Sequence, residues 1–487
     1  MSLSRLILPV VILLVAAAFR LVGLDAFPVW TDEGWSTWAT ERLLEVVPKL
    51  TSDRHPPLYF LALAAWQELA GVSRLALRLP SVLAGLLTVA LTWHIGQRLL
   101  GWQAAAYGAA LVAILPVSVY YSQEIRHFSW LTLSLCASSV LFMRVLRRPS
   151  LPRYLLYAVS VALSMYILYF AVFVIVMQAG VALLVWRGGL RQKLYFVGAW
   201  ALALGLFAPW LYVVLRYQAE FLLRGVAGAG SIEGITPEVL LSLLQDVMGW
   251  GVPLLAVGWI LAGVALARRW PERERTQFAY VLAWGVGTFI LMALINPWAT
   301  VFRLRTVSPL IPALALAAAW GLSSLPVRWQ AVVFGIVLPL SLVRTAPIQP
   351  RLDYPLTAQA LAEGYQPGDL IVMETAWDDD AFLYEIQRLV GFDADVIRTL
   401  QWVDYRGPNK LVVLEVEDRL RAAERIWVIH WNQPTQVASW LQGTDEDFEQ
   451  VEVSYHSVGA EYEAYEDGYF ARIDGPVRLY LFAKEGQ

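Results

Sequence analysis

The sequence has little cysteine, little histidine and few charged residues. Of its 487 residues one is cysteine, Cys136, and five are histidine. A single cysteine excludes an intramolecular disulfide, and no Cys/His spacing typical of a zinc site occurs. The chain also lacks a glycine-rich phosphate-binding loop and a G-x-S-x-G nucleophile elbow. These absences disfavour nucleotide-dependent transfer and serine-hydrolase chemistry.

Charged residues make up 16% of the chain, whereas 58% of residues are hydrophobic and the mean hydropathy is +0.53. Soluble domains carry about 25% charged residues, so we expect an integral membrane protein. The charge is unevenly divided. Residues 1–350 contain 26 Lys+Arg and 14 Asp+Glu (net +12), and residues 351–487 contain 11 and 26 (net −15). This division predicts a membrane domain over 1–350 and an acidic soluble domain over 351–487.

Long apolar runs predict the membrane topology. A helix that crosses a bilayer needs about 20 mostly apolar residues, and about eleven runs qualify. They are 6–24, 76–97, 103–121, 128–146, 154–168, 170–186, 194–215, 252–268, 278–296, 306–325 and 330–347. Arg153 and Arg187 bound the fifth and sixth runs, which we interpret as a hairpin. With that hairpin and a cytoplasmic N-terminus, the most basic loops face the cytoplasm, and the C-terminal domain lies outside the plasma membrane.

The soluble domain has the pattern of a small α/β fold with a more β-rich end. Thr357–Glu363 has the pattern of a helix and Pro367-Gly368-Asp369 that of a turn. Short β-prone apolar runs occupy 370–374, 426–429, 451–455 and 477–483. Asp378-Asp379-Asp380 lacks the ligand spacing of a calcium loop, and we interpret it as a solvated turn.

Two long external connections are predicted in the membrane domain. The first, residues 25–75, contains amphipathic pieces at 35–47 and 57–70. The piece 57–70 is too short to span and is expected to lie along the membrane interface. The second connection, 216–251, contains a short helical pattern at 237–248.

Carboxylates concentrate just after the first apolar run. Seven of the fourteen in residues 1–350 lie between residues 25 and 68, and the next 150 residues contain only Glu124. Asp32 and Glu33 are adjacent and flanked by Trp30 and Trp35, and indole rings settle at the membrane interface. A carboxylate held among them is partly desolvated, which raises its pKa and its basicity. We therefore predict a functional role for Asp32, although solvated loops also use acidic residues freely.

Arg54 and His55 stand before Pro56-Pro57, a pair that begins a helix cleanly. Both would then lie beside a helix N-terminus, where unpaired amides and the helix dipole attract anions. A phosphate is the obvious anion at a lipid interface. The alternative is a plain turn with a solvated histidine.

Two further pairs carry charge beside apolar segments. Glu124 and Arg126 stand two residues apart in an apolar region. Placing charged groups in such a region costs free energy, and those that occur there are usually functional. A structural ion pair is the alternative. Arg303 and Arg305 precede an apolar helix on the predicted external side. Arginine forms bidentate pairs with phosphate, but arginines that anchor a helix by snorkelling have the same pattern.

Taken in order, five segments resemble the GT-C glycosyltransferases that use polyprenyl-phosphate sugars. The nearest group is the bacterial relatives of dolichyl-phosphate-mannose–protein mannosyltransferases, near the lipid A aminoarabinose transferases. The segments are Trp30-Thr-Asp-Glu-Gly34, Arg54-His-Pro-Pro-Leu-Tyr-Phe60, Leu75-Ala-Leu-Arg-Leu-Pro-Ser-Val-Leu-Ala-Gly85, Tyr121-Ser-Gln-Glu-Ile-Arg126 and Arg303-Leu-Arg-Thr-Val-Ser-Pro309. The resemblance implies a polytopic α-helical GT-C fold with a catalytic first external loop and an extracytoplasmic α/β domain.

The resemblance also implies roles for individual residues. Asp32 would be the catalytic base, Glu33 its partner, and Glu124 a second acidic position near the acceptor or a divalent metal (Mg, Mn or Zn). Glu124 and His55 are the candidate metal ligands. Arg-Leu-Arg stands where relatives commonly show Arg-Tyr, so either arginine could match. The donor phosphate would be held by basic side chains: Arg54, His55, Arg126, and Arg303 or Arg305.

The resulting hypothesis is an inverting transfer of a hexose or pentose from polyprenyl phosphate to a glycan, lipid or protein on the external face. The expected partners are therefore a lipid-linked sugar, membrane lipid and an acceptor, without nucleic acid. A transporter or flippase of a lipid-linked substrate is the alternative. That class predicts charges and broken helices near the membrane centre, whereas the acidic residues here concentrate outside the predicted spans. A non-catalytic member whose acidic domain binds a partner is a third reading.

Overall fold

The structure is a computed structural model of the whole chain. It describes residues 4–51, 53, 55–219, 259–260, 275–299, 301, 304–323, 325–330, 332, 335, 354–374, 379–398, 413–431, 437, 440–441, 448–457 and 476–484. The chain divides into two compact units. The helical unit comprises Met1–Leu24, Arg42–Gly71 and Leu75–Ile348, and the mixed unit comprises Asp25–Glu41, Val72–Arg74 and Gln349–Gln487. Residues 25–75 are thus shared between the two units.

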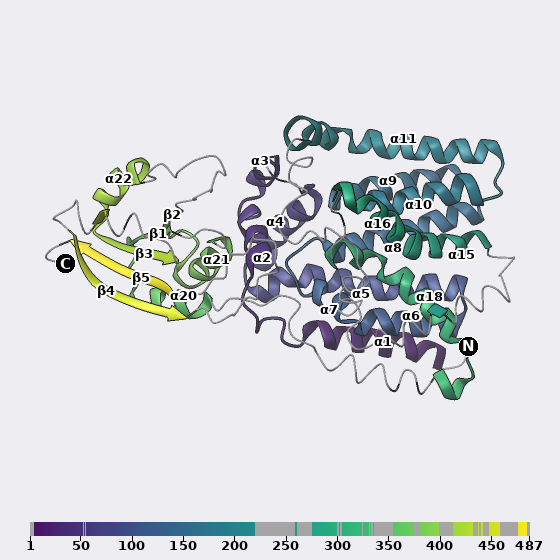
Figure 1. The fold of residues 1–487 in the computed structure, drawn as a ribbon, viewed down its shortest axis with the longest axis horizontal. Coiled ribbons are helices and arrows are strands. Elements are labelled where there is room, and N and C mark those ends of the chain that lie inside the picture. Colours follow the sequence, from purple (N-terminus) through teal and green to yellow (C-terminus); the bar gives the residue numbers. More distant parts are fainter. Residues whose placement is uncertain are drawn as a thin grey trace. The chain divides into compact units, whose positions relative to one another are not determined.

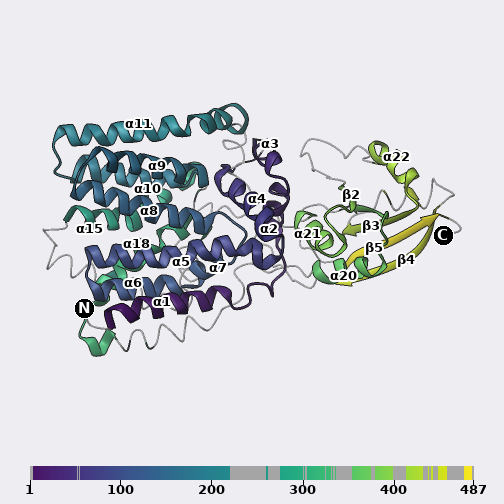
Figure 2. The same cartoon turned by 180° about the vertical axis from the view of Figure 1, so that it is seen from behind.

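The helical unit is built from helices, of which the longest are apolar and run side by side (Figure 1). In chain order they are α1 (Ser4–Leu21), α3 (Val46–Thr51), α4 (Leu58–Ala70), α5 (Arg74–Leu99), α6 (Trp102–Ile114), α7 (Pro116–Ser122), α8 (Phe128–Arg147), α9 (Leu151–Ile167), α10 (Ala171–Gly180), α11 (Leu190–Val213), α15 (Arg275–Leu282), α16 (Thr288–Ala299), α17 (Leu304–Val307) and α18 (Ile311–Ser323). Short 3-10 segments lie at Leu43–Glu45 (η1) and Ser308–Leu310 (η8), and π-helical segments at Val181–Val185 (η2), Val214–Gln218 (η3) and Ala283–Gly287 (η7). The view from behind shows α11 again at the edge of these helices (Figure 2).

Within the described residues, five helices are long and apolar enough to cross a membrane, or six if the bent pair α6–α7 is one span. The chain is therefore a multi-pass membrane protein. The run 103–121, expected to be one span, is broken by a bend of 59° between α6 and α7. Proline explains the break, because Pro116 has no N–H to donate to the Val112 carbonyl one turn earlier. The predicted hairpin region 154–186 does contain two helices, α9 and α10.

Arg20 of α1 donates hydrogen bonds to backbone carbonyls at the break between α6 and α7. Its guanidinium is fully buried and donates Nη2 to the Val112 carbonyl (3.1 Å) and Nη1 to the Ala113 carbonyl (2.8 Å). The same side chain donates to the Ser118 hydroxyl (3.0 Å) and the Ser122 hydroxyl (3.1 Å) of α7. Backbone groups freed inside a membrane domain need such internal partners, so Arg20 holds α7 at its bend.

A buried polar chain ties together α8, α9, α10 and α15. Tyr157 donates to the Gln178 side chain (2.7 Å), and Gln178 donates to the Tyr280 hydroxyl (3.0 Å). Tyr280 lies 2.6 Å from the Ser139 hydroxyl, which itself donates to the Leu135 carbonyl. Interhelical polar contacts of this kind hold membrane helices together, because lipid tails are as apolar as the helices themselves. Cys136 lies on α8, like Ser139, and is buried, as expected of a small core residue.

The mixed unit contains a five-stranded sheet of order β2-β1-β3-β5-β4. Its strands are β1 (Leu370–Glu374), β2 (Asp395–Arg398), β3 (Arg425–Trp431), β4 (Phe448–Ser457) and β5 (Pro476–Lys484), and its helices are α2 (Thr31–Ala39), α20 (Tyr354–Gly364), α21 (Asp379–Val390) and α22 (Val413–Ala422). Strand β1 is parallel to β2 and β3, whereas β5 is antiparallel to β3 and β4. An α/β half thus joins an antiparallel half in one sheet.

Both faces of the sheet are covered by helices. Alternate residues of a strand point to opposite faces. Leu370 and Val372 of β1 cluster with Leu420 of α22, whereas a Cβ on Gly364 of α20 would lie 2.8 Å from the Trp427 ring of β3. The residue opposite Trp427 in the register is Ile371. Helices α22 and α20 therefore pack on opposite faces, and Figure 1 shows them on either side of the strands.

Some sequence predictions of local structure were wrong in detail. Asp379 and Asp380 are not in a solvated turn but begin α21, where acidic side chains favour the positive end of the helix dipole. The expected piece 35–47 is instead two helical segments, because α2 ends at Ala39 and η1 begins at Leu43. The expected helix 237–248 and most of runs 252–268 and 330–347 lie outside the described residues.

Candidate functional site

The most buried charged residues of the helical unit that the sequence singled out lie in the loop between α7 and α8. They are Glu124, which is 0% exposed, and Arg126, which is 3% exposed; His127, which follows Arg126, is 1% exposed. This loop is fixed by hydrogen bonds to neighbouring elements. Gln123 donates to the Arg20 carbonyl (3.1 Å) and the Phe19 carbonyl (3.3 Å) near the end of α1, where helix carbonyls lack intrahelical donors.

Helix α5 supports the loop from another side. Its Ser81 hydroxyl donates to the Arg126 carbonyl (3.2 Å). Trp130 at the start of α8 donates its indole N–H to the Pro80 carbonyl of α5 (3.2 Å). Glycine at position 85 is required here, because a Cβ would lie 2.2 Å from the Ser122 hydroxyl and 2.8 Å from Nε of Arg20. The loop is therefore held by a rigid helical frame.

Helix α4 is positioned by a second proline effect. Pro80 inside α5 cannot donate to the Ala76 carbonyl, and Trp66 of α4 donates its indole N–H to that carbonyl instead (2.8 Å). Buried Tyr59 and Phe60 lie at the first turn of the same helix. His55 just before α4 is thereby held close to the loop between α7 and α8.

His55 links a carboxylate to a guanidinium. Its Nε2 lies 3.3 Å from Nη2 of Arg126, and its Nδ1 lies 2.8 Å from Oδ2 of Asp53. A guanidinium nitrogen can only donate, so Nε2 is the acceptor and Nδ1 carries the proton that is donated to Asp53. The Asp53–His55–Arg126 chain therefore fixes the histidine tautomer and orients the arginine.

His127 completes this cluster, and sequence reasoning missed it. Its ring centroid lies 5.1 Å from that of His55, 6.0 Å from Phe60 and 4.5 Å from Phe128. Burial, and then the positive charge of Arg126, holds the pKa of His127 well below its ordinary value. The ring is therefore neutral at pH 7. Its position directly after Arg126 is the only signal in the sequence that pointed to it.

Arg305 lies in α17 and is partly buried, and its charge makes the smallest contribution to the lowered pKa of His127. Of the basic residues predicted for the donor phosphate, the structure thus brings His55 and Arg126 into contact and leaves Arg305 within electrostatic range of His127. Arg54 and Arg303 lie outside the described residues. Together with the N-terminus of α8, which follows His127 directly, this arrangement is suited to binding an anion.

The cluster does not fit a metal ion. Both ring nitrogens of His55 are engaged, one by Asp53 and one by Arg126, so neither is directed at a cation. Across the part of the chain that the structure describes, no group of three or more His, Cys, Asp or Glu residues is arranged for metal binding. The buried Glu124 is the remaining metal candidate from the sequence.

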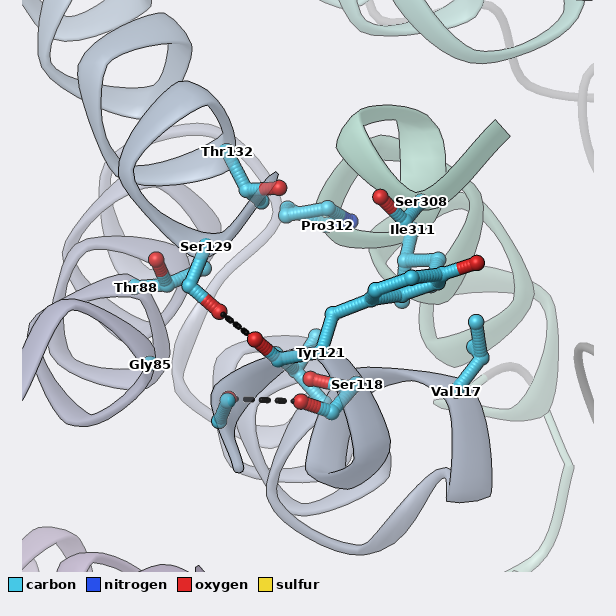
Figure 3. A pocket seen from close by; sticks show the side chains of 12 residues that line it. Gly85, Thr88, Val117, Ser118, Tyr121, Ser129, Thr132, Ser308, Ile311 and Pro312 are labelled. Carbon is cyan, nitrogen blue, oxygen red and sulfur yellow. Dashed lines mark hydrogen bonds between the residues drawn. The ribbon is translucent and has the colours of Figure 1, made fainter. Parts of the chain in front are cut away.

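A small cavity next to the loop is lined by hydroxyl groups (Figure 3). The side chains labelled there include Thr88, Ser118, Tyr121, Ser129 and Ser308, from α5, α7, α8 and η8. Its volume of ≈ 20 Å³ exceeds the roughly 10–15 Å³ that one water needs. The cavity therefore suits ordered water and is too small for a sugar.

Asp32 and Glu33 lie in the mixed unit, in the first turn of α2. Glu33 is 0% exposed and accepts the Trp30 backbone N–H (3.4 Å). In a capping box the N-cap side chain would also accept a backbone N–H from the third helical residue. The indole of Trp30 has no acceptor, so only the hydrogen bond to Glu33 forms. Asp32 is partly exposed. The adjacent carboxylates are therefore unequal: one caps the helix, and the other is accessible at its N-terminal end.

Comparison with known proteins agrees with this architecture. The family model described as dolichyl-phosphate-mannose-protein mannosyltransferase matches residues 54–213, about a third of the chain. That segment includes His55 and Arg126 and begins one residue after Asp53. No curated protein matches the chain in sequence.

Solved structures match over almost the whole chain. ArnT from Cupriavidus metallidurans bound to undecaprenyl phosphate has a TM-score of 0.64 at 13% identity and covers 98% of each chain. Its apo state gives 0.62 at 14% identity and 97% of each chain. The Archaeoglobus fulgidus oligosaccharyltransferase in its apo form gives 0.58 at 12% identity, over 88% of this chain and 70% of that one. Identities this low show a shared fold. The chain therefore has the fold of the GT-C glycosyltransferases, and over residues 54–213 it matches the dolichyl-phosphate-mannose-protein mannosyltransferase family.

Proposed function

We propose that the protein is an inverting glycosyltransferase that moves a hexose or pentose from a polyprenyl-phosphate donor to an acceptor on the external face of the membrane. The observation that carries the proposal is the Asp53–His55–Arg126 chain beside His127, in which Arg126 is buried and the other two side chains are partly buried. A preoriented guanidinium in a dry, aromatic-walled site suits a phosphate monoester or diester. A lipid-phosphate donor is supported by the structure of ArnT bound to undecaprenyl phosphate and by that of the oligosaccharyltransferase AglB from Archaeoglobus fulgidus in complex with a dolichol-phosphate.

Donor binding is assigned to the helical unit. Arg126 would bind phosphate oxygens, while His55 occupies one guanidinium nitrogen and restricts the rotation of the side chain. Arg305 would add a second positive charge. As the bond between the sugar and the phosphate breaks, negative charge grows on the leaving phosphate, and fixed cations in a poorly solvated site stabilise it. Neutral His127 adds no charge and shields the site from water.

The base is assigned to Asp32. The acceptor oxygen or nitrogen attacks the anomeric carbon and forms the new glycosidic bond. The bond from that carbon to the phosphate oxygen breaks, and polyprenyl phosphate leaves with the electron pair. Asp32 takes the proton of the acceptor, which contributes about 10²–10⁴-fold to such reactions. Attack opposite the leaving group inverts the anomeric configuration. Glu33 would hold the turn on which Asp32 stands, and Glu124 is proposed to face the acceptor.

The orientation belongs to the same proposal. The N-terminus is placed in the cytoplasm and the acidic residues 351–487 outside the plasma membrane, as the distribution of Lys and Arg in the loops indicates. In that orientation, the loop containing Asp32 and the loop between α7 and α8 lie on the external side.

The test uses purified full-length protein with synthetic polyprenyl-phosphate hexoses and pentoses and a panel of envelope acceptors. Release of polyprenyl phosphate that depends on the acceptor is expected from the wild type. Asp32→Asn should lower turnover about 10²–10⁴-fold. The matched control is Asp25→Asn, which removes an exposed carboxylate of the same loop and should keep wild-type turnover.

Two results would contradict this. Unchanged turnover in Asp32→Asn would remove the residue from its role. Movement of labelled lipid-linked sugar across proteoliposomes without phosphate release would instead support a flippase and overturn the transferase proposal.

A further inference from the structure

Glu385 of α21 is a buried carboxylate that the proposed reaction does not use. Its side chain is 0% exposed and accepts hydrogen bonds from three residues. Arg74 donates Nε to Oε1 (3.0 Å) and Nη2 to Oε2 (2.6 Å), a bidentate pair. Arg388 donates Nε to Oε2 (3.2 Å), and the Val29 backbone N–H donates to Oε1 (3.2 Å). A buried carboxylate with this many donors is a specific, well-compensated anchor.

The hydrogen bond from Val29 to Glu385 joins two segments that lie 356 positions apart in the sequence. Val29 is buried and directly precedes Trp30, the N-cap residue of α2. Asp32 follows within the first turn. Glu385 therefore fixes the backbone immediately before the segment that carries the proposed base.

Arg74 and Tyr384 tie the remaining part of the loop to the same helix. Arg74 also donates to the Asp25 carbonyl (3.4 Å), at the other end of the segment that leads to α2. Tyr384, next to Glu385 in α21, donates its hydroxyl to the Val72 carbonyl (2.8 Å). The segments Asp25–Glu41 and Val72–Arg74 thus both attach to α21, and this explains why they group with the C-terminal residues.

A second, independent observation comes from Gly34. A Cβ at this position would lie 2.2 Å from the Ala381 backbone nitrogen and 2.6 Å from the Asp380 carbonyl carbon. These atoms belong to the backbone of α21 and cannot rotate away. Helices α2 and α21 therefore approach at backbone distance, and glycine directly after Asp32-Glu33 is what allows it.

We propose that α21 is the platform that holds the catalytic segment, with Glu385 as a positioning residue for Asp32. The inference rests on the proposed function, because it takes Asp32 as the base. It assigns a task to residues 351–487: this domain stabilises the backbone from which the base acts. No substrate contact by Glu385 is required.

The expected effect is on the chemical step. Misplacing a catalytic group by about 1 Å can cost on the order of 10²-fold in rate, so Glu385→Gln should lower kcat by about that factor. The KM for the lipid-linked donor should stay near the wild-type value, because the phosphate site lies in the helical unit. Arg74→Lys keeps the charge and loses the bidentate geometry, so its kcat should fall between those of the wild type and Glu385→Gln.

The experiment measures three quantities on the full-length protein: kcat and donor KM, the stoichiometry of polyprenyl-phosphate binding, and amide hydrogen exchange at residues 29–39. Glu385→Gln should speed exchange in 29–39 and leave exchange in β1 and β3 and the binding stoichiometry unchanged. General unfolding would change the last two as well. Asp395→Asn is the control, because it removes an exposed carboxylate of the same unit that pairs with Arg419.

The outcomes separate this inference from the proposed function. If exchange at 29–39 is the same in Glu385→Gln as in the wild type, the platform does not exist, whatever the activity. If exchange rises but kcat is unchanged, Glu385 is not a positioning residue and the inference is overturned. If exchange rises in the variant while the wild type transfers no sugar, the anchor is confirmed and the transferase proposal fails instead.

Discussion

Two regions that the sequence marked as functional are built in different ways. The loop between α7 and α8 is buried and held by hydrogen bonds: Gln123 reaches the end of α1, Ser81 holds the Arg126 carbonyl, and His55 links Arg126 to Asp53. The α2 segment leaves Asp32 partly exposed and is held by close helix packing and one buried carboxylate on α21.

This difference matches a division of labour. A phosphate site gains from fixed donors in a dry environment, because preorganised charges need no rearrangement during the reaction. A base must reach a variable acceptor, so it has to remain accessible while its backbone is fixed. Substitutions in the first region should therefore change donor binding and transition-state charge, and substitutions in the second should change kcat alone.

After Asp32→Asn, the largest expected effect is that of Arg126→Ala. It removes the guanidinium from the cluster, and loss of one such preorganised donor costs about 10²–10³-fold in rate. Donor KM should rise together with the fall in kcat/KM. Steady-state kinetics of polyprenyl-phosphate release measure both. Arg191→Gln, an exposed arginine of α11 that contacts Tyr195, is the control. A variant with only kcat reduced would erase the distinction between the two regions.

Gly34→Ala should affect the other region. The added methyl group meets the α21 backbone, and overpacking of this kind costs about 1–3 kcal/mol. We expect lower thermal stability of the mixed unit and reduced kcat, with donor KM unchanged. Melting curves with kinetics on the same sample give the result. Gly205→Ala in α11, where a Cβ meets nothing within 4 Å, should be neutral. Equal behaviour of the two variants would mean that α2 does not pack on α21.

The smallest expected effect concerns His127. Its pKa is lowered in the folded protein by burial first and by the charge of Arg126 next. In the unfolded chain the imidazole takes up a proton near pH 6.5, whereas the folded protein does not. The free energy of unfolding is therefore unaffected above that pH. It falls as the pH drops below it, by at most about 1.4 kcal/mol per pH unit.

The measurement is chemical or thermal unfolding in detergent between pH 7.5 and 5, with EDTA present. His127→Gln should show a shallower loss of stability on the acid side and the same slope above pH 7. If the variant and the wild type lose stability equally steeply on the acid side, His127 is solvated in the folded protein, and the cluster around it is not dry.

Much of the local structure could be predicted from the sequence. Apolar runs such as 76–97 and 128–146 became α5 and α8, because burying about 20 apolar residues is a property of one contiguous segment. The strands at 370–374 and 477–483 followed from short β-prone runs in the same way. Helix α21 was missed, since its acidic start has the composition of a solvated turn.

For the candidate site, the sequence pointed to Asp32, His55, Glu124 and Arg126 but not to their partners. The roles of Pro80 and Pro116 show why. A proline leaves a carbonyl without its donor wherever it occurs in a helix, but only the fold reveals that Trp66 serves Ala76 and Arg20 serves Val112. Nothing near Arg20 in the sequence indicates that a helix more than 90 residues away needs it.

The sequence by itself determined that this is a multi-pass membrane protein with an acidic C-terminal part and an Asp32-Glu33 pair after the first apolar run, because composition and periodicity are local properties. Only the tertiary structure decided that Glu33 caps α2, that His127 joins His55 and Arg126, and that Glu385 anchors Val29 from 356 positions away. Those contacts depend on side chains that meet only after folding. Their specificity lies in hydrogen-bond geometry and backbone distance, which no residue type encodes alone.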